Sequence, residues 1–161
     1  MGFRIIVSLF LFFFLTCLFS SCGLLFGQKI RVKIDVDRAV NENSPVSLDV
    51  VLVYDENLLK ELQKLTAKEW FEKRDQMSRD TPKGVAFDFW EWELVPGHGV
   101  PPRTLYVPVK TVLIYPKARV KAGVVFASYA SPGPHREAIA ADEDIVIHLL
   151  EKEFKVKPFK E

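Results

Sequence analysis

The clearest pattern in the chain is a strict alternation of apolar and polar residues over residues 29–37, KIRVKIDVD. The apolar residues fall at every second position, which predicts a β-strand with one buried face and one face in water. A second apolar stretch, VSLDVVLVYD over residues 46–55, is more continuous and predicts a central strand with both faces covered. Between them, residues 38–45 read RAVNENSP, and their Asn, Ser and Pro indicate a loop.

The hydrophobic period then changes to that of a helix. The spacing of four leucines predicts a first helical face: Leu58, Leu59, Leu62 and Leu65. Thr66 and Glu69 form a capping box, with Leu65 and Trp70 placed for a hydrophobic staple, so a second helix starts at Thr66 and ends in the turn of residues 80–84. The apolar side of this helix comprises Ala67, Trp70, Phe71 and Met77. Because its polar side mixes acidic and basic groups, we expect a helical insertion that closes one end of a sandwich, and not a membrane-binding helix.

Strand residues return in VAFDFWEWELV, residues 85–95. Phe87 and Phe89 share one face of this strand, whereas Trp90 and Trp92 lie on the other. A change of the apolar face within one strand predicts a β-bulge near Phe89.

The later part of the chain contains further short strands. TLYVPV, residues 104–109, is a strand with Pro108 at an edge or a bulge, and VLIYP, residues 112–116, is ambiguous. Three more features are predicted in order: a central strand in residues 119–130, a loop in residues 131–136, and a closing hairpin in residues 144–159. About seven or eight short strands, one helical excursion and no βαβ rhythm predict an antiparallel β-sandwich over residues 29–161.

The N-terminal part has a different character. The apolar run from Ile5 to Phe19 has the length of a signal-peptide core, and LFSSCG follows at residues 18–23. A small-small-Cys ending resembles the bacterial lipobox, so residues 1–21 are predicted to be a lipoprotein signal peptide, and residues 22–28 a tether with a lipid on Cys22. The residues leave open a second interpretation, in which Ile5 to Phe26 remains as an uncleaved anchor helix.

Charge and cysteine content narrow the possible partners. The chain has 22 basic and 21 acidic side chains, and this balance gives no reason to expect a nucleic-acid partner. Its 2 cysteines, Cys17 and Cys22, both lie in or at the end of the N-terminal segment. We therefore expect a sandwich without disulfides, whose stability comes from its core.

Few residues suggest chemistry. His98, His135 and His148 stand apart without metal-ligand spacing, and no nucleophile motif or phosphate-binding glycine turn is present. Glu91 and Glu93 fit the polar face of an exposed strand better than an acid/base pair. We therefore expect neither enzyme activity, nor a metal, nor any cofactor besides the covalent lipid. A glycan-binding face of Trp90, Trp92 and Tyr106 is the alternative function, although aromatic residues on a sandwich strand more often belong to the core.

Several features follow one another in a recognisable order. Cys22 precedes the amphipathic first strand, then come NENSPV, a strand ending in LVY at residues 52–54, and the Leu-, Phe- and Trp-bearing helix. LVPG at residues 94–97 and AGVVFASYA before His135 and Arg136 complete the series. In this order the chain resembles the TssJ family, the outer-membrane lipoproteins of type VI secretion, over essentially everything after Cys22.

The resemblance implies a transthyretin-like β-sandwich with an added helical piece, held by its acylated cysteine on the periplasmic side of the outer membrane. It implies a non-enzymatic protein that binds the periplasmic domain of a TssM-like inner-membrane protein through loops of the sandwich. The residue after Cys22 is Gly23 and not Asp, which resembles the sorting pattern of lipoproteins sent to the outer membrane. Two features depart from the family: His135 stands where a Trp is more familiar, and the helical piece is enlarged.

Two loops are the candidate contact surface. Asn41, Glu42 and Asn43 are polar residues with no evident structural task beyond turning the chain, and exposed loops of a rigid scaffold commonly carry binding residues. The alternative interpretation of the same three residues is an Asx-rich turn without a binding role. His135 and Arg136, at the end of the second loop, are the next candidates.

Overall fold

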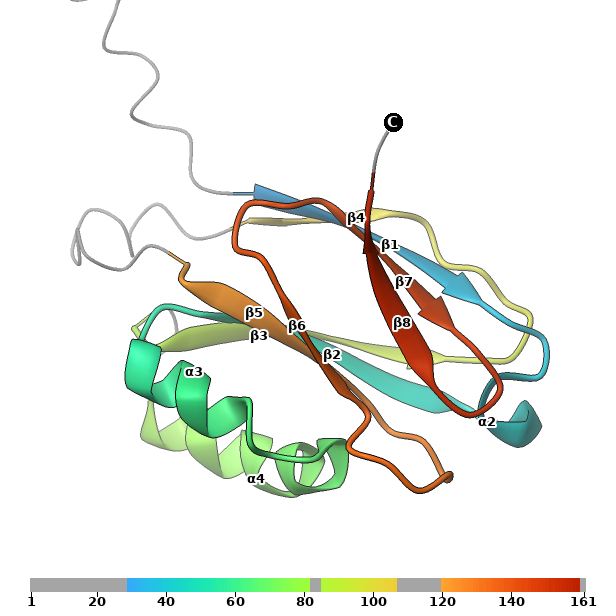
Figure 1. Ribbon diagram of the computed structural model, residues 1–161, viewed down its shortest axis with the longest axis horizontal. Coiled ribbons are helices and arrows are strands. Elements are labelled where there is room, and N and C mark those ends of the chain that lie inside the picture. The colour runs from blue at the N-terminus through green and yellow to red at the C-terminus, as the bar shows by residue number, and fades with distance from the viewer. Residues whose placement is uncertain (1–28, 82–84, 107–119, 160–161) are drawn as a thin grey trace, which may run out of the picture.

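A computed structural model describes residues 29–81, 85–106 and 120–159. In this part of the chain, two four-stranded sheets pack face to face, with strand orders β4-β1-β7-β8 and β3-β2-β5-β6 (Figure 1). The prediction of a β-sandwich is therefore confirmed. The first sheet consists of β1 (Lys29–Val36), β4 (Arg103–Tyr106), β7 (Ile145–Leu149) and β8 (Phe154–Pro158). The second consists of β2 (Val46–Val53), β3 (Phe87–Leu94), β5 (Ala122–Ala127) and β6 (Arg136–Ile139).

The core between the sheets follows from the alternation along the strands. In β1 the apolar side chains are buried and the charged ones are more exposed, as predicted. Every residue of β2 except Ser47 is buried, because this strand has neighbours on both sides and cover on both faces. β5 is also central, between β2 and β6, and β7 and β8 form the predicted closing hairpin.

One strand pair differs from the predicted antiparallel arrangement. β1 and β7 are parallel, and Val32 pairs with Ile145. Parallel neighbours require a long crossover, and here all four strands of the second sheet, together with β4, lie between β1 and β7 in the chain. The first sheet is therefore mixed, and the second is antiparallel.

The helices α3 (Glu56–Leu62) and α4 (Ala67–Asp80) cover the outer face of the second sheet (Figure 1). The prediction of an insertion between early strands is confirmed, but the prediction that it closes one end of the sandwich is wrong. Trp70 of α4 is fully buried and stacks on Phe126 of β5, with 5.1 Å between the ring centroids. A second apolar cluster fills this layer, so the apolar side of the helix requires a sheet face as its partner.

The predicted bulge near Phe89 is wrong. β3 pairs with β2 without interruption, from Val46 opposite Leu94 to Val53 opposite Phe87. Phe89 packs in the cluster under the helices, whereas Trp90 and Trp92 pack against the core between the sheets. Because the helices cover β3 on one face at Phe87 and Phe89 and the first sheet covers its other face, apolar residues can occur on both faces of a regular strand.

Local signals fix where the helices begin. The Thr66 hydroxyl accepts a hydrogen bond from the Glu69 backbone N–H at 3.3 Å, and the Glu69 carboxylate accepts one from the Thr66 backbone N–H at 2.7 Å. The predicted capping box is thus confirmed. The hydrogen bond that the Glu69 carboxylate accepts from the Thr66 backbone N–H also lowers the pKa of Glu69. Asp55 caps α3 in a similar way, through the N–H groups of Asn57 and Leu58.

Several predictions concern residues outside the described ranges. These are the signal peptide of residues 1–21, the tether of residues 22–28, Pro108, and the ambiguous residues 112–116. Within the described ranges, the helices are all too short or too polar to cross a bilayer.

Candidate functional site

Connections from both sheets meet at one end of the sandwich, which we call the loop end: residues 37–45, 128–135 and 150–153. The strand register explains the meeting, because the last residue of β1 pairs with Leu149, the last residue of β7. β2 begins opposite Leu94, the last residue of β3, at the same end (Figure 1). The described chain enters β1 at the opposite end, at Lys29. The loop end therefore lies at the end of the sandwich opposite to Lys29.

The first of these connections is a left-handed turn, α2 (Val40–Asn43), where the sequence predicted a loop. Asn41, Glu42 and Asn43 have φ angles of 48°, 55° and 65°. Asn tolerates this region because its short side chain can bond locally, but a Glu there carries a steric cost. The strained backbone at Glu42 persists because the surrounding contacts hold it.

Asn41 supplies those contacts. Its side chain is buried, its Nδ2 donates to the Pro45 carbonyl at 3.0 Å, and its Oδ1 accepts from the Ala130 backbone N–H at 2.7 Å. The interpretation that Asn41 has no structural task is therefore wrong. Glu42 and Asn43 are exposed, as the sequence suggested. Asn41 thus joins the first loop to the second, and the two neighbouring residues are presented to solvent.

The second loop is joined in turn to the third. The Tyr129 hydroxyl lies 2.9 Å from the Glu153 carbonyl oxygen and 3.1 Å from that of Leu150. The Ser131 hydroxyl donates to the Lys152 carbonyl at 2.7 Å. Burial raises the pKa of Tyr129, so its hydroxyl remains a donor. Side-chain bonds therefore connect all three segments of the loop end, and no pattern in the sequence indicates these long-range pairs.

His135 and Arg136 lie at the end of the second loop and have internal contacts. The His135 ring stacks on Tyr129, with 5.0 Å between centroids, and its Nε2 lies 2.6 Å from the Ser131 carbonyl oxygen. Arg136 donates through Nη1 to the carbonyls of Lys64 and Leu65, at 2.9 and 2.7 Å. Both predicted contact residues therefore position the second loop, His135 within the loop and Arg136 against the connection between α3 and α4.

A groove of about 550 Å³ lies beside the loop end, between α4 and the second loop. Its apolar lining includes Ala67, Phe71, Tyr129 and Pro132, and Lys68 and Glu72 lie at its polar side. The Ala67 backbone N–H donates to the Pro134 carbonyl at 2.8 Å and holds the helix start against the loop. The groove is connected to α2 through Ala130, which lines it and whose backbone N–H donates to Asn41.

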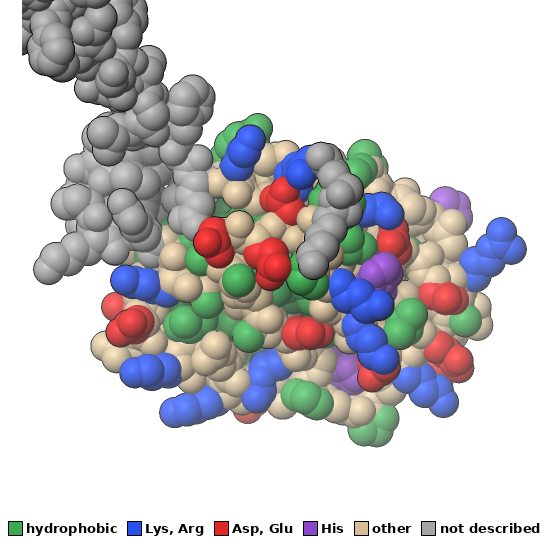
Figure 2. Space-filling model, turned by 45° about the horizontal axis from the view of Figure 1, so that its top comes forward, with side chains coloured by type: hydrophobic (Ala, Val, Ile, Leu, Met, Phe, Trp, Pro, Cys, Tyr) green, Lys and Arg blue, Asp and Glu red, His purple; other side chains and the backbone are tan. Residues whose placement is uncertain are grey.

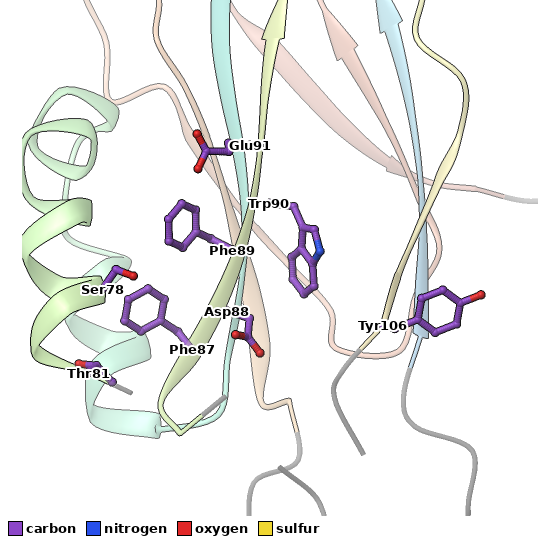
Figure 3. A pocket seen from close by; sticks show the side chains of 8 residues that line it. All are labelled: Ser78, Thr81, Phe87, Asp88, Phe89, Trp90, Glu91 and Tyr106. Carbon is purple, nitrogen blue, oxygen red and sulfur yellow. The ribbon is translucent and has the colours of Figure 1, made fainter. Parts of the chain in front are cut away.

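The aromatic residues of the alternative function are not gathered on one exposed face. Trp90 and Trp92 are half-buried and pack against the core, and Trp92 also lies under the Arg103 guanidinium, 5.5 Å from its ring centroid. Tyr106 is 66% exposed and, with Trp90, lines a hollow at the edge of β3 that Trp92 does not line (Figure 3). This arrangement lacks the flat platform that stacking on a sugar ring requires.

Among the remaining titratable candidates, Glu91 and Glu93 line one small hollow together with Asp49 and Arg74, whereas His98 and His148 do not line it. The Glu93 carboxylate accepts from the Ser47 hydroxyl at 2.8 Å, and Glu91 lies 3.7 Å from an Arg74 nitrogen. His98 Nδ1 lies 3.0 Å from the Pro96 carbonyl oxygen, and His148 Nδ1 lies 3.3 Å from Asp35. In the described ranges, three side chains of the types that bind metals do not gather at any point.

The surface charge is mixed: basic side chains (Lys, Arg) and acidic side chains (Asp, Glu) are interspersed over the face shown in Figure 2.

Comparison with solved structures identifies proteins of similar fold. The chain superimposes on the type VI secretion lipoprotein TssJ1 from Pseudomonas aeruginosa with a TM-score of 0.59 and 11% identity, over 84% of this chain and 98% of that chain. The chain has a TssJ-like fold. No family model matches the sequence. No curated protein matches it either.

Two further structures share the TssJ-like fold. Lip from Serratia marcescens, a membrane-bound component of the type VI secretion system, gives a TM-score of 0.56 at 15% identity, over 84% of this chain and 99% of that chain. A chain in the structure of the TssM C-terminal domain from EAEC gives 0.52 at 13% identity, over 82% of this chain and 98% of that chain.

Proposed function

We propose that this protein is an outer-membrane lipoprotein that scaffolds a type VI trans-envelope complex and binds the periplasmic domain of a TssM-like inner-membrane protein. The observation that carries the proposal is the TssJ-like fold, matched over 98% to 99% of the chains of two type VI secretion lipoproteins. The balanced charge, and the fact that the similar structures are type VI secretion components, fit a scaffold protein without catalytic activity.

The anchor in this proposal is a lipid on Cys22. It is supported by the SSC ending of the apolar run, and two or three acyl chains hold a protein firmly where one gives only reversible binding. Cys22→Ser is expected to leave the precursor uncleaved and unlipidated. Mass spectrometry and membrane fractionation test this, and a variant that matures to the wild-type mass would remove the anchor from the proposal.

The contact surface in this proposal is the loop end, with Glu42 and Asn43 as contacting residues. Three observations support the choice: both residues are exposed, Asn41 fixes their backbone, and the groove beside α4 adds an apolar recess. A fixed loop loses little conformational entropy on binding, which favours affinity. His135 and Arg136 contribute by holding the second loop.

Calorimetry with the purified periplasmic domain of the cognate TssM-like protein tests the contact. We expect a dissociation constant of roughly 1 μM, about 8 kcal/mol. Glu42→Gly with Asn43→Gly is expected to weaken binding about tenfold, within the range of interface hot spots, without a lower melting temperature, because glycine adopts the positive φ angles of these positions. The matched control is Glu56→Ala with Asn57→Ala, which changes the same residue types at exposed positions at the start of α3, outside the loop end. Absence of heat and of a complex on gel filtration for the wild type would contradict the proposed role.

A further inference from the structure

β3 forms one edge of the second sheet and, among the described strands, pairs only with β2. The Tyr54 backbone N–H donates to the Ala86 carbonyl at 2.8 Å, which fixes the phase of the ladder between β2 and β3. Residue pairs in an antiparallel ladder alternate between bonded and non-bonded, so Asp88, Trp90 and Trp92 exchange backbone bonds with β2. The N–H and C=O groups of Phe89, Glu91 and Glu93 therefore point away from β2, toward the outer edge.

These outward groups have no hydrogen-bond partner among the residues that the structure describes. The edge of the first sheet that β8 forms is less available for pairing. There the outward Val156 N–H already donates to Glu137 at 3.1 Å, and Pro158 has no backbone N–H. β4 exposes an edge of only 4 residues, whereas β3 has 8. An open edge of this length is a template for another strand, which natural proteins usually protect.

A hollow of about 350 Å³ adjoins this edge (Figure 3). Phe87 and Phe89 point toward α4 on one side of β3, and Trp90 lies on the other side, facing the strand that carries Tyr106. Ser78 and Thr81 of the helical layer complete the lining. A strand added at this edge would thus place an apolar side chain into the hollow while its backbone pairs with Phe89 and Glu91.

Charge selects among possible strands. Glu91 and Glu93 are exposed and lie on the same face, two residues apart. A second copy of β3 would bring these carboxylates close to their equivalents, and like charges across a strand pair are destabilising. Arg74 neutralises Glu91 only in part, at 3.7 Å. The edge therefore opposes pairing with itself and favours a strand that carries basic residues opposite the two glutamates.

We propose that the outer edge of β3 binds an extended segment of a partner protein by strand addition, with two basic side chains opposite Glu91 and Glu93 and an apolar side chain in the hollow lined by Phe87, Phe89 and Tyr106. This surface is separate from the loop end, and the proposal does not rest on the TssM-like partner. Main-chain hydrogen bonds supply the affinity. The two charge pairs and the apolar contact together supply the selectivity.

The probe is a capped synthetic peptide of β-branched residues with two lysines separated by one residue. Added to the full-length protein in detergent, it is expected to slow amide hydrogen exchange at Phe89, Glu91 and Glu93 at least about tenfold, since these amides gain partners. Trp90 and Trp92, whose amides already bond to β2, should change little. The alternating pattern distinguishes strand addition from binding to side chains alone. A peptide methylated at the amides that face β3, but of equal charge, is the matched control and should not bind.

Two substitutions separate the backbone from the charge. Glu91→Gln removes the carboxylate and keeps the outward N–H, and it is expected to weaken the peptide about threefold, as for one cross-strand charge pair. Glu91→Pro also removes the N–H while leaving the bonds to β2 intact, since proline is tolerated where the donor faces outward. It should weaken binding at least about tenfold further, with a retained melting temperature.

The outcomes are distinct. Alternating protection together with a weaker peptide complex for Glu91→Pro than for Glu91→Gln supports strand addition. Equal affinity for the two variants, undiminished binding of the methylated peptide, or no protection at millimolar peptide would each overturn it. Concentration-dependent dimers of the free protein that Glu91→Pro abolishes would also overturn it, because the occupant would then be a second copy.

Discussion

The Nη1 atom of Arg74 lies 2.7 Å from the Oδ2 atom of Asp49, and this pair joins α4 to the central strand of the second sheet. The Asp49 side chain is fully buried, and its carboxylate also accepts from Trp70 Nε1 at 2.8 Å. Burial raises the pKa of Asp49, while the bonds from Arg74 and Trp70 oppose that change. A buried carboxylate with these two donors gives α4 a fixed position over β2.

Removal of one partner of this pair should destabilise the fold strongly. Arg74→Met leaves Asp49 buried with only Trp70 as a side-chain donor, and we expect a loss of about 3 kcal/mol in the free energy of unfolding. The double variant with Asp49→Asn should lose less than the sum of the single variants, because neither charge then remains buried. Urea denaturation measures both, with the exposed Arg79→Met as the control. A loss below about 0.5 kcal/mol for Arg74→Met would show that the pair does not stabilise the fold.

Substitutions of Asn41 and Glu42 should change the stability of the fold in opposite directions. Asn41→Ala removes the acceptor of the Ala130 N–H and the donor to Pro45, with an expected cost of about 2 kcal/mol. Glu42→Gly relieves the positive φ angle and should raise stability by up to about 1 kcal/mol. Thermal unfolding of the two variants decides the point, and equal melting temperatures would contradict the assigned role of the turn.

Acid stability should depend on Asp144. The backbone N–H of Arg31 and its guanidinium, each at 2.7 Å, hold the pKa of Asp144 below its ordinary value. The folded pKa is the lower one, so this contribution is complete above the unfolded pKa of about 4 and is lost as pH falls through the folded pKa. Asp144→Asn should lose about 1 kcal/mol at neutral pH, allowing for the exposure of Arg31.

When the pH is lowered from neutral, the Asp144→Asn variant should lose less stability than the wild type. Melting temperatures recorded from about pH 6 to about pH 2.5 test the difference in slope. Parallel pH profiles for the two proteins would contradict the role of Asp144.

The tryptophans distinguish the two functions considered. Trp70 is fully buried, and Trp90 and Trp92 are half-buried against the core. Iodide should therefore quench the fluorescence weakly, with a Stern–Volmer constant at least about threefold below that of the urea-unfolded chain, because burial excludes the ion. Quenching near the unfolded level, reversed by an added oligosaccharide, would favour glycan binding over assembly.

The sequence predicted the features that depend on neighbours in the chain. The capping box at Thr66 and the burial of β2 on both faces follow from local spacing, and both are confirmed. The role of Asn41 depends on Ala130, far along the chain, and no periodic pattern contains that information. The regular path of β3 was missed for a related reason: a strand covered by helices on one face and by a second sheet on the other lacks a single apolar side.

The parallel pair of β1 and β7 has a consequence for the order of folding. The strands and helices of the second sheet come from the stretch of chain from β2 to β6, which is interrupted only by β4, whereas the pairing of β1 with β7 requires Ile145, far along the chain from Val32. Closing so long a loop is slow, since its entropy is lost before the contact forms. Pulsed hydrogen exchange during refolding should therefore show protection in β2 and β5 before β7. Because β7 and β8 complete the first sheet, the sandwich stays incompletely folded until these late strands have been synthesised.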